Sequence, residues 1–151
     1  MTHRHSSDTD PMRDDLQTML REFQAKHHLT LAFHQQINME AATKKIQHWH
    51  RHMSRRLFGR NFRDLPPDQR IEFLLLPEGG HANLHFHGVI RLPETHQRYF
   101  ERIALSRWRH VAFKGTLHFG PFDPIKGGPE GWYSYITKGH LCNQMLYSSM
   151  D

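Results

Sequence analysis

The segment formed by residues 84–90 constrains the fold of this chain more than any other, because two kinds of side chain alternate along it. Successive side chains of a β-strand point to opposite faces of the sheet. The apolar residues at even positions would face a core, while His85 and His87 share the other face. Neutral histidine is the commonest metal ligand, so two imidazoles on one face can converge on a metal ion. Such a pair also arises by composition, because the chain has 15 histidines.

Length and composition indicate one domain of 151 residues with a core of its own. We expect a disordered arm over residues 1–12 and a single domain over 13–151.

No apolar run approaches the roughly 20 residues of a membrane helix, and the N-terminus lacks a signal-peptide core. The single cysteine, Cys142, cannot form an internal disulfide, which fits the cytoplasm. A net charge of +5 favours nucleic acid over a membrane as the partner.

Hydrophobic periodicity predicts the order of the elements. Helices are expected over 13–27, from the N-cap Asn38 to 58, over 94–110 and from Pro129 to 139, and strands over 29–34, 71–76, 84–90 and 116–119. The buried stripe expected on the second of these helices consists of Ala42, Ile46, Trp49, Met53 and Leu57. The resulting order is a helix, then βαββαβ, then a helix. This is an α+β chain of the ferredoxin-like type, an antiparallel sheet with two helices on one face. The other face would be open to a metal and to DNA, and terminal helices would complete the domain.

A metal held by two histidines needs at least one more ligand. Glu78 is the leading candidate, because it ends the strand that would pair with the histidine strand in a hairpin. Glu72 and His81 are alternatives, since the register of a sheet cannot be derived from sequence alone. Open coordination positions on such a metal would polarise a phosphate.

Tyr135 and Lys138 are three residues apart, so on a helix they would share a face. A nearby ammonium or metal would stabilise the phenolate of Tyr135 or neutralise the phosphate that it attacks. Tyr133 lies about 200° around the helix from Tyr135, so both phenols cannot face one metal. The alternative is that Tyr135 is a packing aromatic and that Lys138 stabilises the end of the helix.

One face of the predicted helix 38–58 is basic and has few acidic neighbours. Such a face is commonly only solvated, but it could also follow a phosphate backbone. Polar side chains of the first strand lie on the predicted open face. The candidate DNA-binding residues are Thr30, His34, Lys44, Lys45, Arg51, Arg55 and Arg56.

Three short motifs follow one another along the chain. They are Leu-Thr-Leu at 29–31, Glu-Gly-Gly at 78–80 followed by His-Phe-His-Gly at 85–88, and Tyr-x-x-Lys at 135–138. This order resembles the HUH endonucleases, and within them the rolling-circle replication initiators of plasmids and small single-stranded-DNA phages. The resemblance covers about residues 28–140 and includes the run 117–124 ahead of the third motif.

The resemblance implies a metal-dependent endonuclease that nicks and rejoins single-stranded DNA at an origin or hairpin. His85 and His87, with Glu78 as the best-matched acidic residue, would bind Mg²⁺ or Mn²⁺. Tyr135 would attack a phosphate to leave a 5′-phosphotyrosine, and Lys138 would position the metal or phosphate. Because the chain ends soon after the third motif, a helicase would be supplied in trans.

Other functions are compatible with parts of this pattern. The alternative within the same family is a transposase or a relaxase of a mobile element. A histidine-triad hydrolase would need a third alternating histidine, and a 2H phosphoesterase would need a second His-x-Thr/Ser motif besides residues 28–30. From a different class, a non-catalytic single-stranded-DNA-binding protein or repressor would use the same basic helix and exposed aromatic residues.

Overall fold

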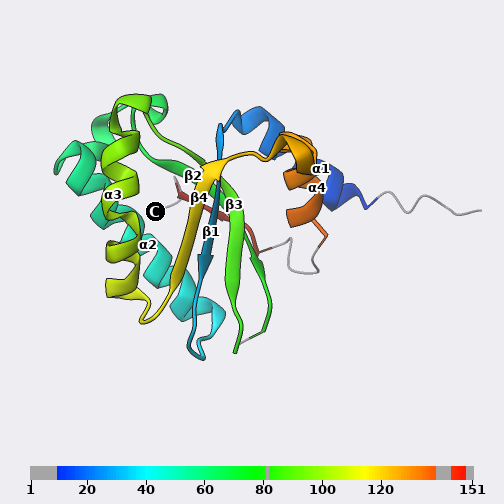
Figure 1. Ribbon diagram of the computed structural model, residues 1–151, viewed down its shortest axis with the longest axis horizontal. Helices are drawn as coiled ribbons and strands as arrows, with labels where there is room; N and C mark the ends of the chain where they lie inside the picture. Colours follow the sequence, from blue (N-terminus) through cyan, green and yellow to red (C-terminus); the bar gives the residue numbers. More distant parts are fainter. Residues whose placement is uncertain (1–9, 81, 139–143, 149–151) are drawn as a thin grey trace, which may run out of the picture.

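A five-stranded antiparallel sheet separates two layers of helices, as the computed structural model in Figure 1 shows. The structure describes residues 10–80, 82–138 and 144–148. The strand order is β4-β1-β3-β2-β5, so the α+β class predicted from the sequence is confirmed. The strands are β1 His27–Ala32, β2 Glu72–Glu78, β3 His85–Arg91, β4 Thr116–Pro121 and β5 Leu146–Tyr147.

Two pairs of helices cover the two faces of the sheet. On one side lie α2 and α3, and on the other lie α1 and α4 (Figure 1). The terminal helices therefore occupy part of the face that we expected to be open. No helix in the described part of the chain has both the length and the apolarity that a membrane span requires. The helices are α1 Pro11–Phe23, α2 Met39–Phe58, α3 Gln97–Val111 and α4 Gly128–Ile136, with 3₁₀ turns at Phe62–Asp64, Pro67–Gln69, Glu94–His96 and Pro124–Lys126.

The larger core fills the layer between the sheet and α2 and α3. The Asn38 side chain caps α2 by accepting a hydrogen bond from the backbone of Ala41 at 2.8 Å, as its position before the helix predicts. The side chains at even positions of β3 are buried here, which confirms the predicted alternation. The buried stripe of α2 is also confirmed, and it consists of Ala42, Ile46, Trp49, Met53 and Leu57.

A second, smaller core lies between the sheet and the two terminal helices. Leu74 and Leu76 of β2 and Val89 of β3 pack there against the apolar faces of α1 and α4. Strand β2 is consequently buried on both faces, which explains why it reads as a continuous apolar run. The two terminal helices are joined by an ion pair between Arg21 and Glu130 at 2.7 Å.

Several boundaries differ from the prediction for local reasons. Helix α1 begins at Pro11 because the Asp10 side chain accepts hydrogen bonds from two backbone amides of the first turn. It ends at Phe23, where Gln24 takes a left-handed conformation with φ 54°. Strand β1 therefore starts at His27, two residues earlier than expected.

The short strand β5 was not predicted. It pairs with the edge of β2, and the Ser148 hydroxyl that follows it donates to the buried carboxylate of Glu72 and accepts from the backbone of Phe73. These bonds attach the C-terminal segment to the sheet. Three features that the sequence analysis considered, most of the N-terminal arm (residues 1–9), His81 and Cys142, lie outside the described residues.

Candidate metal centre and adjoining cleft

Three potential metal ligands converge at the end of the hairpin formed by β2 and β3. They are Glu78, His85 and His87, whose ligand atoms all lie within 4.8 Å of one another. Oε2 of Glu78 is 3.3 Å from Nε2 of His85 and 2.9 Å from Nε2 of His87. Two imidazole nitrogens and one carboxylate oxygen on one side leave the remaining positions of a metal ion open to a substrate.

The strand register brings these ligands together. Glu78 pairs directly with His85 across the hairpin, so both side chains lie on the same face. Gly79 makes the turn possible, because it has a φ of 87° and a Cβ there would lie 2.2 Å from the Asn83 carbonyl. Glu72 is at the far end of β2, about 20 Å away along the strand, where it binds Arg70 and Ser148.

Each histidine is oriented through its Nδ1 atom. Nδ1 of His85 donates to the Asn83 carbonyl at 3.0 Å, which turns the Nε2 side of the ring toward the site. Nδ1 of His87 lies 2.8 Å from the hydroxyl of Thr30, its cross-strand partner. Such partners determine which ring nitrogen can bind a metal.

The surroundings of the His87 ring also suit a metal ligand. Its buried Nε2 has no hydrogen-bond partner among the described residues, although a Glu78 oxygen is only 2.9 Å away. Burial, reinforced by the neighbouring His85, lowers the pKa of His87, while Glu78 opposes that shift. The two imidazoles and the Glu78 carboxylate thus offer three ligand atoms to one cation, and a bound ion would give the buried Nε2 of His87 a partner.

We expect Thr30→Val to weaken Mn²⁺ binding about tenfold, because the valine cannot hold Nδ1 of His87. Thr116→Val is the matched control, since the Thr116 hydroxyl bonds Nε2 of His34 at 3.1 Å in the same sheet. The measurement is calorimetric titration with Mn²⁺. Equal affinities for the two variants would show that the Thr30 bond does not orient a metal ligand.

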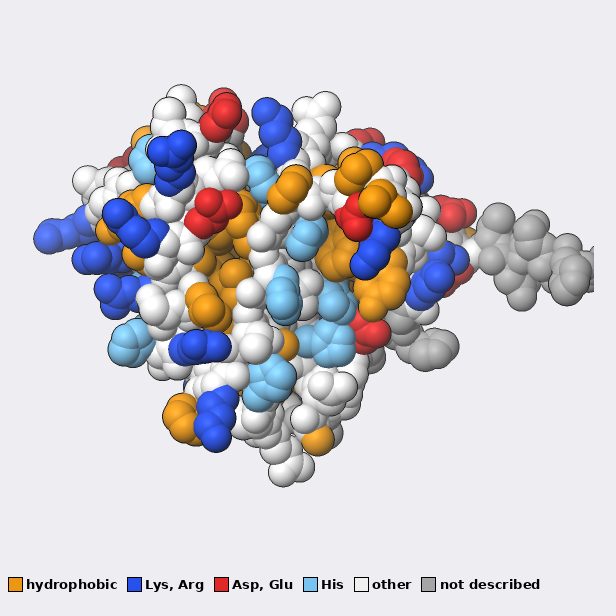
Figure 2. All heavy atoms as spheres, in the orientation of Figure 1, with side chains coloured by type: hydrophobic (Ala, Val, Ile, Leu, Met, Phe, Trp, Pro, Cys, Tyr) orange, Lys and Arg blue, Asp and Glu red, His pale blue; other side chains and the backbone are white. Residues whose placement is uncertain are grey.

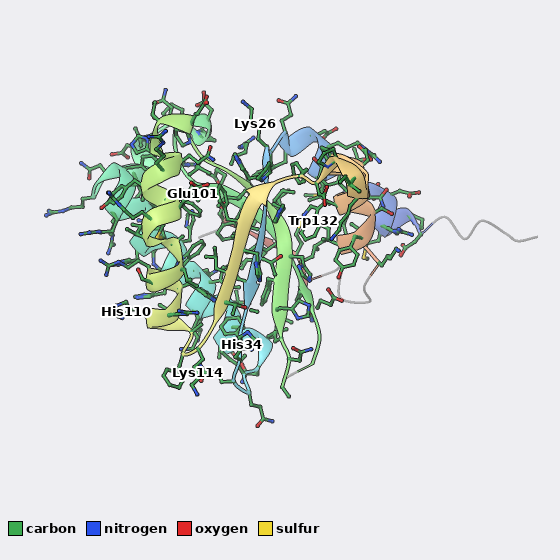
Figure 3. All side chains as sticks on the ribbon, in the orientation of Figure 1. Lys26, His34, Glu101, His110, Lys114 and Trp132 are labelled. Atoms are coloured by element: carbon green, nitrogen blue, oxygen red, sulfur yellow. The ribbon has the colours of Figure 1, made fainter. Side chains whose placement is uncertain are left out.

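Tyr135 lies beside the three ligands, although it is far from them in sequence. Helix α4 presents its ring 5.8 Å from the ring of His87 and stacks it on Trp132 at 5.7 Å. The Trp132 indole in turn donates a hydrogen bond to the Gly88 carbonyl of β3 at 2.8 Å. Trp132 lies where α4 meets the sheet, as labelled in Figure 3. Tyr135 is 52% exposed, so its side chain is accessible from solvent.

The neighbours of Tyr135 have different environments. Tyr133 is buried in the smaller core, and that burial raises its pKa, so its phenol is not available to the site. Helix α4 ends at Ile136, before Lys138, so the predicted shared helical face does not form. Lys138 is exposed in the following turn, and its backbone amide donates to the Tyr135 carbonyl at 3.4 Å.

The basic residues of α2 lie across the sheet from the metal ligands. Helix α2 packs on the larger core, whereas the histidines of β3 project from the opposite face. Lys44 pairs with Glu40 at 3.3 Å, and Lys45 donates to the Val111 carbonyl at the end of α3. Figure 2 shows histidines gathered in the middle of the visible face and Lys and Arg side chains mainly to their left. The structure therefore does not bring Lys44, Lys45, Arg51, Arg55 and Arg56 to the metal centre.

A cleft of about 710 Å³ adjoins the metal centre, and no motif in the sequence had indicated it. It opens between the sheet and α4, and His87 and Tyr135 line both the cleft and the metal centre. The period-two pattern could have identified His28, which shares a strand face with Thr30. The other lining residues are Thr30, His118, Phe122, Asp123, Lys126, Gly128, Gly131 and Trp132.

Comparisons with protein-family models, with curated proteins and with solved structures find no match for this chain. A function for it therefore rests on the residues of this site and their geometry.

Proposed function

We propose that this protein is a metal-dependent endonuclease that nicks and rejoins single-stranded DNA through one tyrosine, Tyr135. The proposal includes membership of the HUH type, with a ferredoxin-like sheet as its scaffold. Rolling-circle initiation for a plasmid or phage is the favoured role. Transposition or mobilisation would use the same chemistry.

One observation carries the proposal. An exposed phenol on α4 lies 5.8 Å, ring to ring, from His87, one of three convergent metal ligands. A core aromatic would be buried, as Tyr133 is. An exposed tyrosine next to open coordination positions is the arrangement that a phosphate-attacking phenol requires.

Tyr135 would act as the nucleophile, and Trp132 would hold its ring in position. The Tyr135 oxygen attacks the DNA phosphorus, so a phosphorus–Oη bond forms while the bond to the 3′ oxygen breaks. The phenol loses its proton to solvent, and the leaving 3′ oxygen takes one up to become a hydroxyl. Stacking on Trp132 holds the phenol ring in place. Since one phosphodiester replaces another, a 3′-hydroxyl can reverse the reaction without ATP.

A divalent ion bound by Glu78, His85 and His87 would polarise the attacked phosphate. Of the two ions considered, Mn²⁺ suits this donor set better than Mg²⁺, because two of the three ligands are imidazole nitrogens. The ordinary phenol pKa is about 10, so charge stabilisation near the Tyr135 hydroxyl would promote its attack at neutral pH.

The test is covalent capture of DNA. A library of single-stranded oligonucleotides incubated with the protein and Mn²⁺ is expected to give an adduct that survives denaturing gel electrophoresis. Chelation with EDTA should abolish the adduct. DNA binding without any adduct across the library would instead favour the non-catalytic single-stranded-DNA-binding protein.

A further inference from the structure

The cleft beside the metal centre has a lining that the tyrosine chemistry does not require. Aromatic rings dominate it: Trp132 lies 5.2 Å and Phe122 6.4 Å, ring to ring, from His28. Three of the lining residues, His28, His87 and His118, are histidines that project from the sheet. Burial is the main cause that lowers the pKa of His28, so this imidazole is neutral near pH 7. A flat heterocycle suits such a surface better than an aliphatic or a fully charged ligand does.

The charged residues of the cleft lie on one loop, ahead of α4. Lys126 is the cation, and Asp123 is the carboxylate. Oδ1 of Asp123 accepts a hydrogen bond from the backbone amide of Ile125 at 2.9 Å, which holds the loop in shape. An ammonium can bind a phosphate, and a carboxylate accepts hydrogen bonds from the amino group of a base.

The size and position of the cleft indicate what occupies it. A volume of about 710 Å³ falls within the range of pockets that enclose small organic ligands. Because His87 and Tyr135 line it as well, a ligand there lies next to the phosphate that Tyr135 would attack. A base pair could not present one base alone to this surface, so the occupant would be unpaired.

We propose that this cleft binds one unpaired nucleotide of the substrate strand, with its base against Trp132 and Phe122 and its phosphate at Lys126. The preferred bases carry an exocyclic amino group, which donates a hydrogen bond to the Asp123 carboxylate. This inference rests on the proposed function for the identity of the strand. The binding of a free nucleotide can nevertheless be measured without any cleavage.

The experiment is fluorescence titration of the whole protein with dCMP in the presence of EDTA. Trp132 lines the cleft, whereas Trp49 and Trp108 are fully buried in the other core, so quenching reports on the cleft. We expect saturable quenching by dCMP and none by inorganic phosphate or 2-deoxyribose 5-phosphate. Trp132→Phe should remove the signal, and dTMP, whose base lacks an amino group, should bind more weakly.

Three variants make the result specific. Lys126→Ala should weaken dCMP binding about fivefold or more, whereas Lys44→Ala, on the far side of the sheet, should leave it unchanged. Asp123→Asn should remove the preference for dCMP over dTMP. Unsaturable quenching, or equal dCMP affinity for Lys126→Ala and the wild type, would overturn the proposal.

The two proposals can fail separately. If dCMP binds as expected and no oligonucleotide forms an adduct, the result supports nucleotide binding in the cleft and contradicts the endonuclease proposal. If an adduct forms, an abasic site at one position next to the cleaved phosphate should reduce its yield. If the adduct forms equally well whichever flanking position carries the abasic site, the proposal that the cleft binds a base is overturned, and the endonuclease proposal is kept.

Discussion

Tyr135→Phe is expected to abolish the protein–DNA adduct and to leave the affinity for the oligonucleotide within about twofold of wild type. The substitution removes only the hydroxyl oxygen that would attack phosphorus. The ring that stacks on Trp132 at 5.7 Å stays, so the cleft and the metal ligands keep their neighbours. Adduct yield on a denaturing gel and binding by fluorescence anisotropy measure the two effects separately.

Tyr133→Phe is the matched control, because Tyr133 lies two residues away on the same helix. Tyr133 is only 4% exposed, and its ring packs against that of Phe122 at 6.0 Å. This variant should form the adduct at the wild-type level. An adduct that persists in Tyr135→Phe and disappears in Tyr133→Phe would contradict the assignment of the nucleophile. Loss of DNA binding in Tyr135→Phe would instead make the phenol a binding group.

Gly88→Ala is expected to have the largest effect on folding. A Cβ at Gly88 would lie 1.8 Å from the Leu74 carbonyl oxygen and 2.9 Å from the Leu75 Cα. Both are backbone atoms of the neighbouring central strand, so no side chain can move aside. Strands β2 and β3 would have to separate, at a cost of about 3 kcal/mol or more. The midpoint of urea unfolding, measured by circular dichroism, gives this change in the free energy of unfolding.

The same substitution should also disturb the metal centre. Gly88 follows His87, and its carbonyl accepts the Trp132 hydrogen bond that attaches α4 to the sheet. Gly80→Ala is the control, because a Cβ there meets no atom of the described residues within 4 Å. Its unfolding free energy should stay within about 0.5 kcal/mol of wild type. If Gly88→Ala is as stable as Gly80→Ala, the close approach of the two strands does not limit folding.

Local pattern alone was enough to derive most elements of this fold. The period-two alternation over 84–90 identifies which side chains of β3 face the larger core, and these are buried as expected. The position of Asn38 locates the start of α2, and its side chain caps that helix. Both results depend on residues within one or two turns or strand positions of one another, which is the range over which sequence acts directly.

The sequence by itself therefore determined the order of the elements from α1 to α4, the shared face of His85 and His87, and the three residues considered as a third ligand. Only the tertiary structure decided that Glu78 joins the two histidines, since this depends on the register between β2 and β3. It also decided that α4 carries Tyr135 to His87, and that the basic face of α2 lies across the sheet from the metal centre. The physical reason is that the packing of segments distant in the chain depends on which apolar surfaces bury one another, and no local periodicity encodes that choice.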